Sequence, residues 1–353
     1  MKKFLFFVAI AAISLASCSN DETIASNSSG EISFRALNNK MTRAADITSA
    51  SDLKSFNVYA FQYNTTSSAY INNVTFTGPD TYVSAAKYYW PSYNLDFYAW
   101  SAHSAANGDR SEDVTPSAYN VYEVTAAASA ANQADFIYAS STNVAKPGDG
   151  IVTALAFAHK ESRIVLKVKN TSANLSFAVT GWKIVYPDKT GTVTFTGTTP
   201  AWSANTDQSV SNVFTSAFSS TTIGANTTTA AEITGSQAMI LIPQSITKPT
   251  AYTGVTSTNI SGPYLAVEYI ATNTTTSETV QAQTWGCWPI PTVTWEAGKQ
   301  YTYTLDLADG GYTETNADED TGLDPIFGGK EIKFSSVTVS AWDTTPGETD
   351  VTM

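Results

Sequence analysis

Nearly every apolar segment of this 353-residue chain repeats with a period of two, and this pattern restricts the fold more than any other feature. Successive side chains of a β-strand point to opposite faces, so a period of two predicts strands with one buried face. Helical periodicity is nearly absent, and the one helix candidate, the Ala-rich piece at 125–133, lacks an apolar face. Many short strands separated by turn residues predict an all-β sandwich or barrel. The expected strands include 32–36, 56–60, 95–99, 155–159, 163–169, 182–186, 193–195, 239–242, 264–270, 301–307, 332–334 and 337–341.

Two local patterns add detail to this expectation. The apolar residues of 182–186 lead through the turn residues 187–191 into Val193, which predicts a β-hairpin. The inward parity changes between Phe334 and Val337, which predicts a bulge or break at Ser335–Ser336.

The length and composition bound the class of protein. A chain of this length predicts about two domains, and the brief charged interruption at His159–Glu161 is the expected boundary, although a strand crossing between sheets would look the same. Charged residues form 14% of the chain and aromatic residues 12%, a makeup that suits pleated sheets. If the first residues, with Lys2 and Lys3, are removed as a signal peptide, 17 basic residues stand against 31 acidic ones, a net charge of −14. This balance argues against nucleic acid as a partner, since binding to phosphates needs positive charge.

The first residues are typical of a bacterial lipoprotein signal. Lys2 and Lys3 precede an apolar run that ends in Leu15, Ala16, Ser17 and Cys18. The run is too short for a stable membrane span, so residues 1–17 are expected to be a cleaved signal peptide. The Cys18 thiol would then carry lipid and anchor the exported chain in the outer membrane. The alternative is an ordinary cleaved signal with an incidental cysteine.

Residues 18–43 are expected to form a tether and a short strand. The polar residues 19–30 read as a flexible tether, and Ile32, Phe34 and Ala36 then alternate with polar neighbours as a half-buried strand. The next segment has no apolar periodicity and exposes Arg43 before Ala44. It is a suitable loop for a trypsin-like protease.

No motif in the sequence points to catalysis, a cofactor or a metal, so no enzyme activity is expected. His103 and His159 have no catalytic context, and Cys287, among aromatic residues, reads as buried and inert. Asp318–Asp324 lacks the ligand spacing of an EF-hand, so a solvated acidic loop is favoured over a calcium site. Thr344 follows an Asp, a weak match to a bacterial O-glycosylation acceptor. A carboxylate pair assembled in space stays open, because such pairs need no local motif.

Several segments, taken in order, resemble the fimbrillin family, the Mfa-like subunits of type V pili in Gram-negative bacteria. Each piece is weakly specific, and their order across nearly the whole chain carries the resemblance. The matching pieces are the signal through Cys18, Glu31–Phe34, Met41–Ala44, Phe56–Ala60, Tyr88–Pro91 with Leu95–Ala99, Ala154–His159, Trp295–Tyr303 and Val337–Trp342.

The resemblance implies two tandem transthyretin-like Greek-key β-sandwich domains, here expected at 44–160 and 161–353. It also implies export as a lipoprotein, cleavage after the arginine matching Arg43, and polymerisation into a cell-surface fimbria by strand donation. The removable strand would carry Ile32, Phe34 and Ala36. The candidate donor strand would carry Val337, Val339 and Ala341, although the polar tail 344–353 contains Pro346 and is a poor strand. The expected partners are other pilus subunits and the processing protease.

Two other functions stay open at this point. A surface lipoprotein that binds glycans would use exposed Trp and Tyr side chains, and an exported hydrolase would need a site that the sequence does not reveal. A tip or anchor role in the pilus is an alternative to a shaft role, because the C-terminal tail is a poor strand.

Overall fold

The computed structural model describes residues 30–38, 53–104, 108–148, 151–203, 207–248, 262–313, 326–327, 332–342 and 351–352. The described chain is all-β, as predicted. Its helical elements are two 3₁₀ turns, η1 (Ala130–Asn132) within the Ala-rich helix candidate and η2 (Leu307–Asp309). The Ala-rich piece therefore forms one short turn in place of an α-helix.

The largest sheet contains β1 (Phe34–Asn38), β2 (Ser55–Gln62), β3 (Ala69–Thr77), β4 (Val83–Ser84), β5 (Leu95–Ser104), β6 (Gly108–Asp109), β9 (Asp135–Val144) and β10 (Thr153–His159). Their order is β1-β10-β9-β5-β2-β3-β4, with β6 paired to β5. Only the β1–β10 pair is parallel among these described strands. Both faces of the central strands are buried: on β5, Phe97 lies in one apolar cluster and Trp100 in another.

A four-stranded sheet covers the Trp100 side of the large sheet. It contains β7 (Val114–Ala118), β8 (Val121–Thr125), β13 (Thr190–Thr196) and β14 (Thr199–Trp202), in the order β14-β13-β8-β7. The rings of Tyr138 and Phe195 stack across this contact, with centroids 3.8 Å apart. Aromatic residues thus fill the space between the two sheets.

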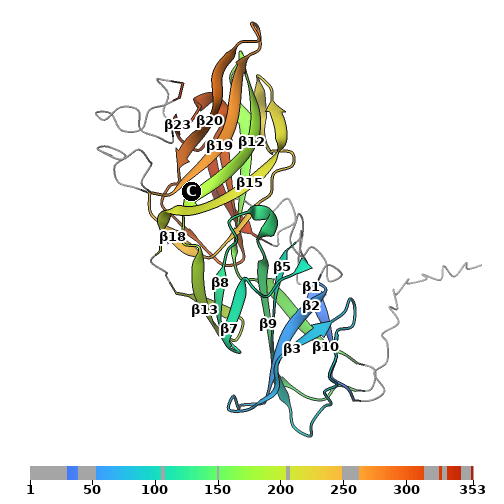
Figure 1. Cartoon of the computed structure of the whole chain (residues 1–353). Coiled ribbons are helices and arrows are strands. Elements are labelled where there is room, and N and C mark those ends of the chain that lie inside the picture. The colour runs from blue at the N-terminus through green and yellow to red at the C-terminus, as the bar shows by residue number, and fades with distance from the viewer. Residues whose placement is uncertain are drawn as a thin grey trace, which may run out of the picture.

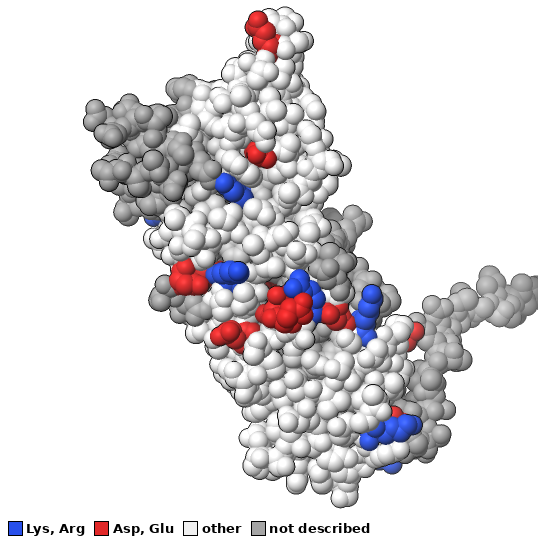
Figure 2. Space-filling view, viewed as in Figure 1, with Lys and Arg blue, Asp and Glu red and all other residues white. Residues whose placement is uncertain are grey.

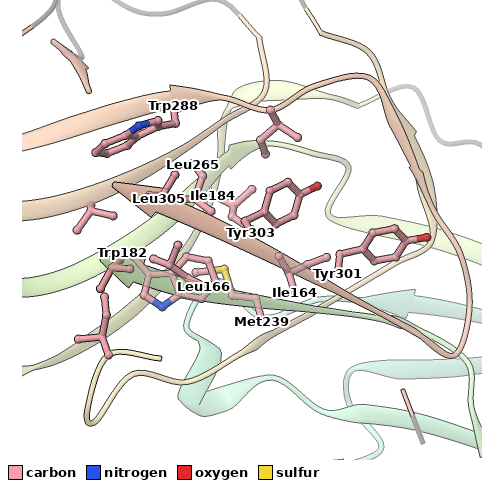
Figure 3. Packing of buried hydrophobic residues seen from close by; sticks show 14 of the residues in the cluster. Ile164, Leu166, Trp182, Ile184, Met239, Leu265, Trp288, Tyr301, Tyr303 and Leu305 are labelled. Atoms are coloured by element: carbon pink, nitrogen blue, oxygen red, sulfur yellow. The ribbon is translucent and has the colours of Figure 1, made fainter. Parts of the chain in front are cut away.

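The C-terminal half contains a second pair of packed sheets. One has β12 (Leu175–Tyr186), β15 (Ser209–Ile223), β19 (Tyr264–Asn273), β20 (Thr279–Pro289) and β23 (Tyr312–Thr313). The other has β11 (Ser162–Asn170), β16 (Thr227–Glu232), β17 (Met239–Leu241), β22 (Lys299–Asp306), β24 (Ser336–Ala341) and β25 (Val351–Thr352). Figure 3 shows their inner faces packing together, with Trp182 and Trp288 from one sheet and Leu166 and Tyr303 from the other. A short ribbon of β18 (Gln244–Ile246) and β21 (Val293–Trp295) completes the described strands.

The hairpin predicted across residues 187–191 is wrong. β12 pairs with β15 and β19, whereas β13 pairs with β8 and β14, so the chain passes from one sheet to another at this turn. Gln244 holds the crossover: its Oε1 accepts the Asp188 N–H at 2.7 Å, and its Nε2 donates to the Asp188 carbonyl oxygen at 3.1 Å. The turn residues indicated a change of direction, but the partner strands come from distant parts of the sequence.

The parity change near the C-terminus lies where β24 begins, and it is not a bulge or break between two strands. β24 begins at Ser336, and Ser335 donates its N–H to the Thr304 carbonyl oxygen at 2.8 Å. Residues 332–334, predicted as a strand, are not one. Their apolar residues still contribute to the core, since Ile332 is buried in the C-terminal cluster and Phe334 packs against it.

The charged segment His159–Arg163 joins β10 to β11 and is almost completely buried, with its charged side chains at most 6% exposed. The Lys160 ammonium donates to the Thr198 carbonyl oxygen at 3.0 Å. The Glu161 carboxylate accepts the Phe136 N–H at 2.8 Å. β13 and β14 follow this segment in the sequence, yet they share a sheet with β7 and β8, which precede it. Strands from before and after residue 160 therefore form one sheet. The division into 44–160 and 161–353 stays a prediction.

The molecule is elongated in Figure 1, with β2, β3 and β10 towards one end and β12, β15, β19 and β20 towards the other. Charged residues gather in a band across the middle of the face shown in Figure 2, and the end that holds β2 and β3 shows few. No helix of the described chain is long and apolar enough to cross a membrane.

Candidate functional site

The N-terminal segment, residues 30–38, connects the two ends of the large sheet. On one side, Phe34–Asn38 run parallel to Thr153–Phe157 of β10. On the other side it pairs with residues 82–90, here called the clamp segment, which contains β4 at the opposite end of the sheet order. The N-terminal segment therefore closes the large sheet into a ring.

Four main-chain hydrogen bonds attach the N-terminal segment to the clamp segment. Ile32 donates to the Tyr88 carbonyl oxygen at 2.7 Å, and Trp90 donates to the Gly30 carbonyl oxygen at 3.0 Å. Phe34 and Tyr82 exchange both of their hydrogen bonds, at 3.0 and 2.8 Å. Main-chain bonds of this kind do not depend on side-chain identity, so another extended segment could make them equally well.

The side chains of residues 32–34 are buried, and those of residues 35–37 are half-buried or exposed. Ile32 and Phe34 are 1% and 0% exposed, Ala36 is half-buried, and Leu37 is 39% exposed. The Phe34 ring packs edge-on against three other phenylalanines inside the ring of strands, with centroid distances of 6.0, 4.9 and 5.1 Å to Phe56, Phe76 and Phe97. The segment thus supplies part of the core as well as the last strand.

One ion pair adds to these contacts. Lys87 Nζ lies 3.1 Å from Glu31 Oε2, and the Lys87 side chain is 63% exposed. The hydrogen bond and charge of Glu31 raise the pKa of Lys87. An exposed pair of this kind adds little stability, so the main-chain bonds and Phe34 dominate the attachment.

The proposed processing and lipidation residues, Cys18, Arg43 and Ala44, lie outside the described residues. So do the acidic loop Asp318–Asp324 and Thr344.

The candidate donor strand lies within this chain's own C-terminal sheet. β24 pairs antiparallel with β22, where Val337 stands opposite Tyr303 and Val339 opposite Tyr301. Its other edge pairs with β25 through Thr338 and Val339. Val337 is buried, whereas Val339 and Ala341 are half-buried.

Trp342 connects the end of β24 to the other half of the molecule. Its ring is 4% exposed and stacks on His159 at the end of β10, with centroids 4.1 Å apart and planes 7° from parallel. The main-chain N–H of Trp342 donates to the Gly298 carbonyl oxygen at 2.8 Å. Any movement of β24 would therefore disturb the junction between β10 and β11.

Two buried histidines pair with carboxylates. His159 Nδ1 lies 2.8 Å from Asp135 Oδ2, and His103 Nδ1 lies 2.9 Å from Asp109 Oδ1. Burial raises the pKa of Glu161 to about 8, with the charge of Asp135 as a smaller contribution. Cys287 is buried. No group of three or more His, Cys, Asp or Glu side chains in the described chain is arranged to hold a metal ion.

Sequence reasoning missed the role of the clamp segment. Tyr88 and Trp90 belong to a piece that carried the family resemblance, yet their main-chain contacts with residues 30–32 could not be read from any local pattern. The available signal was the aromatic composition of residues 88–90 between two strands.

The fold and this arrangement define an all-β protein of several packed sheets, one of which is closed by the chain's own N-terminal segment. Residues 42–342 match the fimbrillin-like family, and the chain belongs to this family.

A fimbrial protein from Bacteroides vulgatus ATCC 8482 shares the fold at a TM-score of 0.54, with 14% sequence identity over 88% of this chain and 99% of that one. A candidate cell adhesion protein from Bacteroides uniformis ATCC 8492 aligns at a TM-score of 0.47, with 14% identity over 89% of this chain and 99% of that one. The comparison with curated proteins finds no match.

Proposed function

We propose that this chain is a structural and adhesive subunit of a cell-surface type V pilus. It would be exported as an outer-membrane lipoprotein attached through Cys18, cleaved after Arg43 and polymerised by donor-strand exchange. The observation that carries the proposal is the closure of the large sheet by residues 30–38, a segment that precedes Arg43 in the sequence.

Cleavage after Arg43 would break the peptide bond that links the N-terminal segment to the rest of the chain, and only non-covalent contacts would then hold the segment. Its departure would leave unpaired main-chain groups on β10 and on the clamp segment, together with the space that Ile32 and Phe34 occupy. Unpaired strand edges favour pairing with another chain. Each large side chain that refilled the space would contribute about 1.5–3 kcal/mol from burial.

The donor would be an extended segment of another pilus subunit, and Val337, Val339 and Ala341 form the candidate donor face of this chain. β24 is hydrogen-bonded on both edges, to β22 and β25, so donation would require it to leave both neighbours. A strand that stays resident, with the donor supplied by a paralogous subunit, is the alternative. The two differ in whether a change on β24 that leaves the free subunit folded blocks assembly.

The domain plan in this proposal is two tandem transthyretin-like β-sandwiches, at 44–160 and 161–353. The two separate pairs of packed sheets support it. The β13–β14 hairpin would then be a part of the second domain that completes a sheet of the first.

The test is to compare wild-type chain with an Arg43→Ala variant after treatment with a trypsin-like protease. We expect the wild-type chain to be clipped at Arg43 and to form a ladder of oligomers, and the variant to stay monomeric with an unchanged melting temperature. Arg35→Ala is the matched control, because Arg35 is an exposed basic residue of β1 that should leave cleavage at Arg43 intact. Normal polymers from Arg43→Ala would remove this cleavage from the mechanism.

A further inference from the structure

Five tyrosines gather around one end of the large sheet. Tyr63 follows β2, Tyr70 lies in β3, Tyr88 and Tyr89 follow β4, and Tyr93 precedes β5. Tyr63, Tyr89 and Tyr93 are 40%, 48% and 37% exposed, which makes them three of the eight exposed large hydrophobic residues in the described chain. Because Tyr costs little conformational entropy when it binds, exposed tyrosines are suited to recognition.

Contacts to Tyr70 hold several of these rings in place. Its ring packs edge-on against Tyr88 and Tyr93, with centroids 6.2 and 6.5 Å apart. Its hydroxyl donates to the Tyr89 carbonyl oxygen at 2.5 Å. Tyr70 thus connects β3 to the loop between β4 and β5.

An amide pair lies beside the rings. Asn94 Nδ2 donates to Asn143 Oδ1 at 2.8 Å, and both side chains are at the surface. The Tyr63 N–H donates to the Asn94 carbonyl oxygen at 2.9 Å, which holds the loop after β2 against the loop before β5. Asn94 and Asn143 together retain unused donor and acceptor capacity, since each side-chain amide offers two N–H groups and a carbonyl oxygen.

The buried carboxylate of Asp96 holds the backbone of two loops beside this amide pair. Asp96 is 6% exposed, and it accepts the N–H groups of Asn143 at 2.7 Å and Asn64 at 3.3 Å. Both of these asparagines have positive φ values, 57° and 60°, a conformation that asparagine tolerates better than most residues. The loops are therefore held before any ligand arrives, which lowers the cost of binding.

The charge and chemistry of the cluster favour one kind of ligand. The exposed side chains are tyrosines and asparagines without formal charge, and the nearby Lys87 ammonium pairs with Glu31 at 3.1 Å. The visible face of this end of the molecule shows few charged residues (Figure 2). Aromatic faces match the apolar faces of sugar rings, and amides match sugar hydroxyls in both donor and acceptor roles.

We propose that Tyr63, Tyr70, Tyr89, Tyr93 and the Asn94–Asn143 pair form a binding site for a neutral oligosaccharide, here called the tyrosine site. The site needs no strand exchange, so it would operate in the uncleaved precursor as well as in a filament. It would give a pilus subunit an adhesive contact at the end of the molecule opposite the C-terminal sheets (Figure 1).

The experiment uses the purified uncleaved protein on an array of neutral oligosaccharides built from glucose, galactose, mannose and N-acetylglucosamine, with calorimetry on the best binder. We expect at least one oligosaccharide to bind, and the double variant Tyr89→Ser, Tyr93→Ser to weaken that binding by about tenfold or more, as removal of a central aromatic contact does. Val280→Ser is the matched control, because Val280 is 50% exposed on β20 in the other half of the molecule. All variants should keep the wild-type melting temperature.

Two results would overturn the proposal. The first is the absence of binding to every oligosaccharide on the array by folded protein. The second is a double variant that binds the oligosaccharide as well as the wild type does. If that variant also fails to polymerise after cleavage, the tyrosines form a contact between subunits and not a sugar site. Normal cleavage and polymerisation by the double variant would separate loss of sugar binding from loss of strand exchange.

Discussion

Replacing Phe34 with Ala tests how strongly the N-terminal segment is held in the uncleaved chain. The Phe34 ring is 0% exposed and is enclosed by three phenylalanines at centroid distances of 4.9–6.0 Å. Removal of a fully buried phenylalanine side chain costs about 3–5 kcal/mol from lost burial and the cavity left behind. β1 lies between β10 and the clamp segment, so the loss should be local to the large sheet.

Hydrogen exchange followed by mass spectrometry can locate this loss, since separate sheets need not unfold together. We expect the amides of β10, at residues 153–159, to exchange roughly 100-fold faster or more in Phe34→Ala, because each 1.4 kcal/mol is a factor of ten. The amides of β12 and β19 should keep their rates. Arg35→Ala is the control, because the Arg35 side chain points outward and its loss should change stability by less than ~0.5 kcal/mol.

A change of less than about 1 kcal/mol at β10 in Phe34→Ala would refute the reasoning, because buried phenylalanines lose more than that on truncation. Such a result would mean that residues 30–38 are only loosely attached in the precursor. Equal acceleration in β12 would instead show that the two pairs of sheets unfold as one unit.

Two further predictions concern the junction and the C-terminal strand. The folded-state pKa of Glu161 is raised from 4.5 to about 8, so its contribution to stability is complete below pH 4.5 and is lost as pH rises through 8. Glu161→Gln keeps an acceptor for the Phe136 N–H but has no proton to release, so it should remove this decline of up to ~5 kcal/mol in the free energy of unfolding. Urea unfolding across the same pH range measures the decline, and parallel wild-type and variant curves would contradict the assignment. Val339→Asp should lower the melting temperature of the free subunit, because a charge placed against the C-terminal core costs several kcal/mol. A Val339→Asp subunit that melts normally yet cannot assemble would identify β24 as a donor.

Features that depend on residues close together in the sequence could be predicted from the sequence. The alternation at 32–36 predicted that Ile32 and Phe34 face the same side, and both are buried. The period-two pattern predicted the all-β class. These predictions succeed because strand geometry relates each side chain to the next but one along the same strand.

The choice of partner strands was decided by the tertiary structure. The turn at 187–191 looked like a hairpin, yet the Gln244 side chain, far away in the sequence, holds it as a crossover between sheets. Similarly, the clamp segment pairs with residues 30–34 through main-chain groups, which every residue type other than proline carries in the same form. The charged residues at His159–Glu161 suggested a domain boundary or a strand crossing between sheets, and only the structure shows that they are buried, with partners from distant parts of the chain. Local periodicity fixes which side of a strand is apolar, whereas pairing and burial of polar groups depend on contacts between residues that only folding brings together.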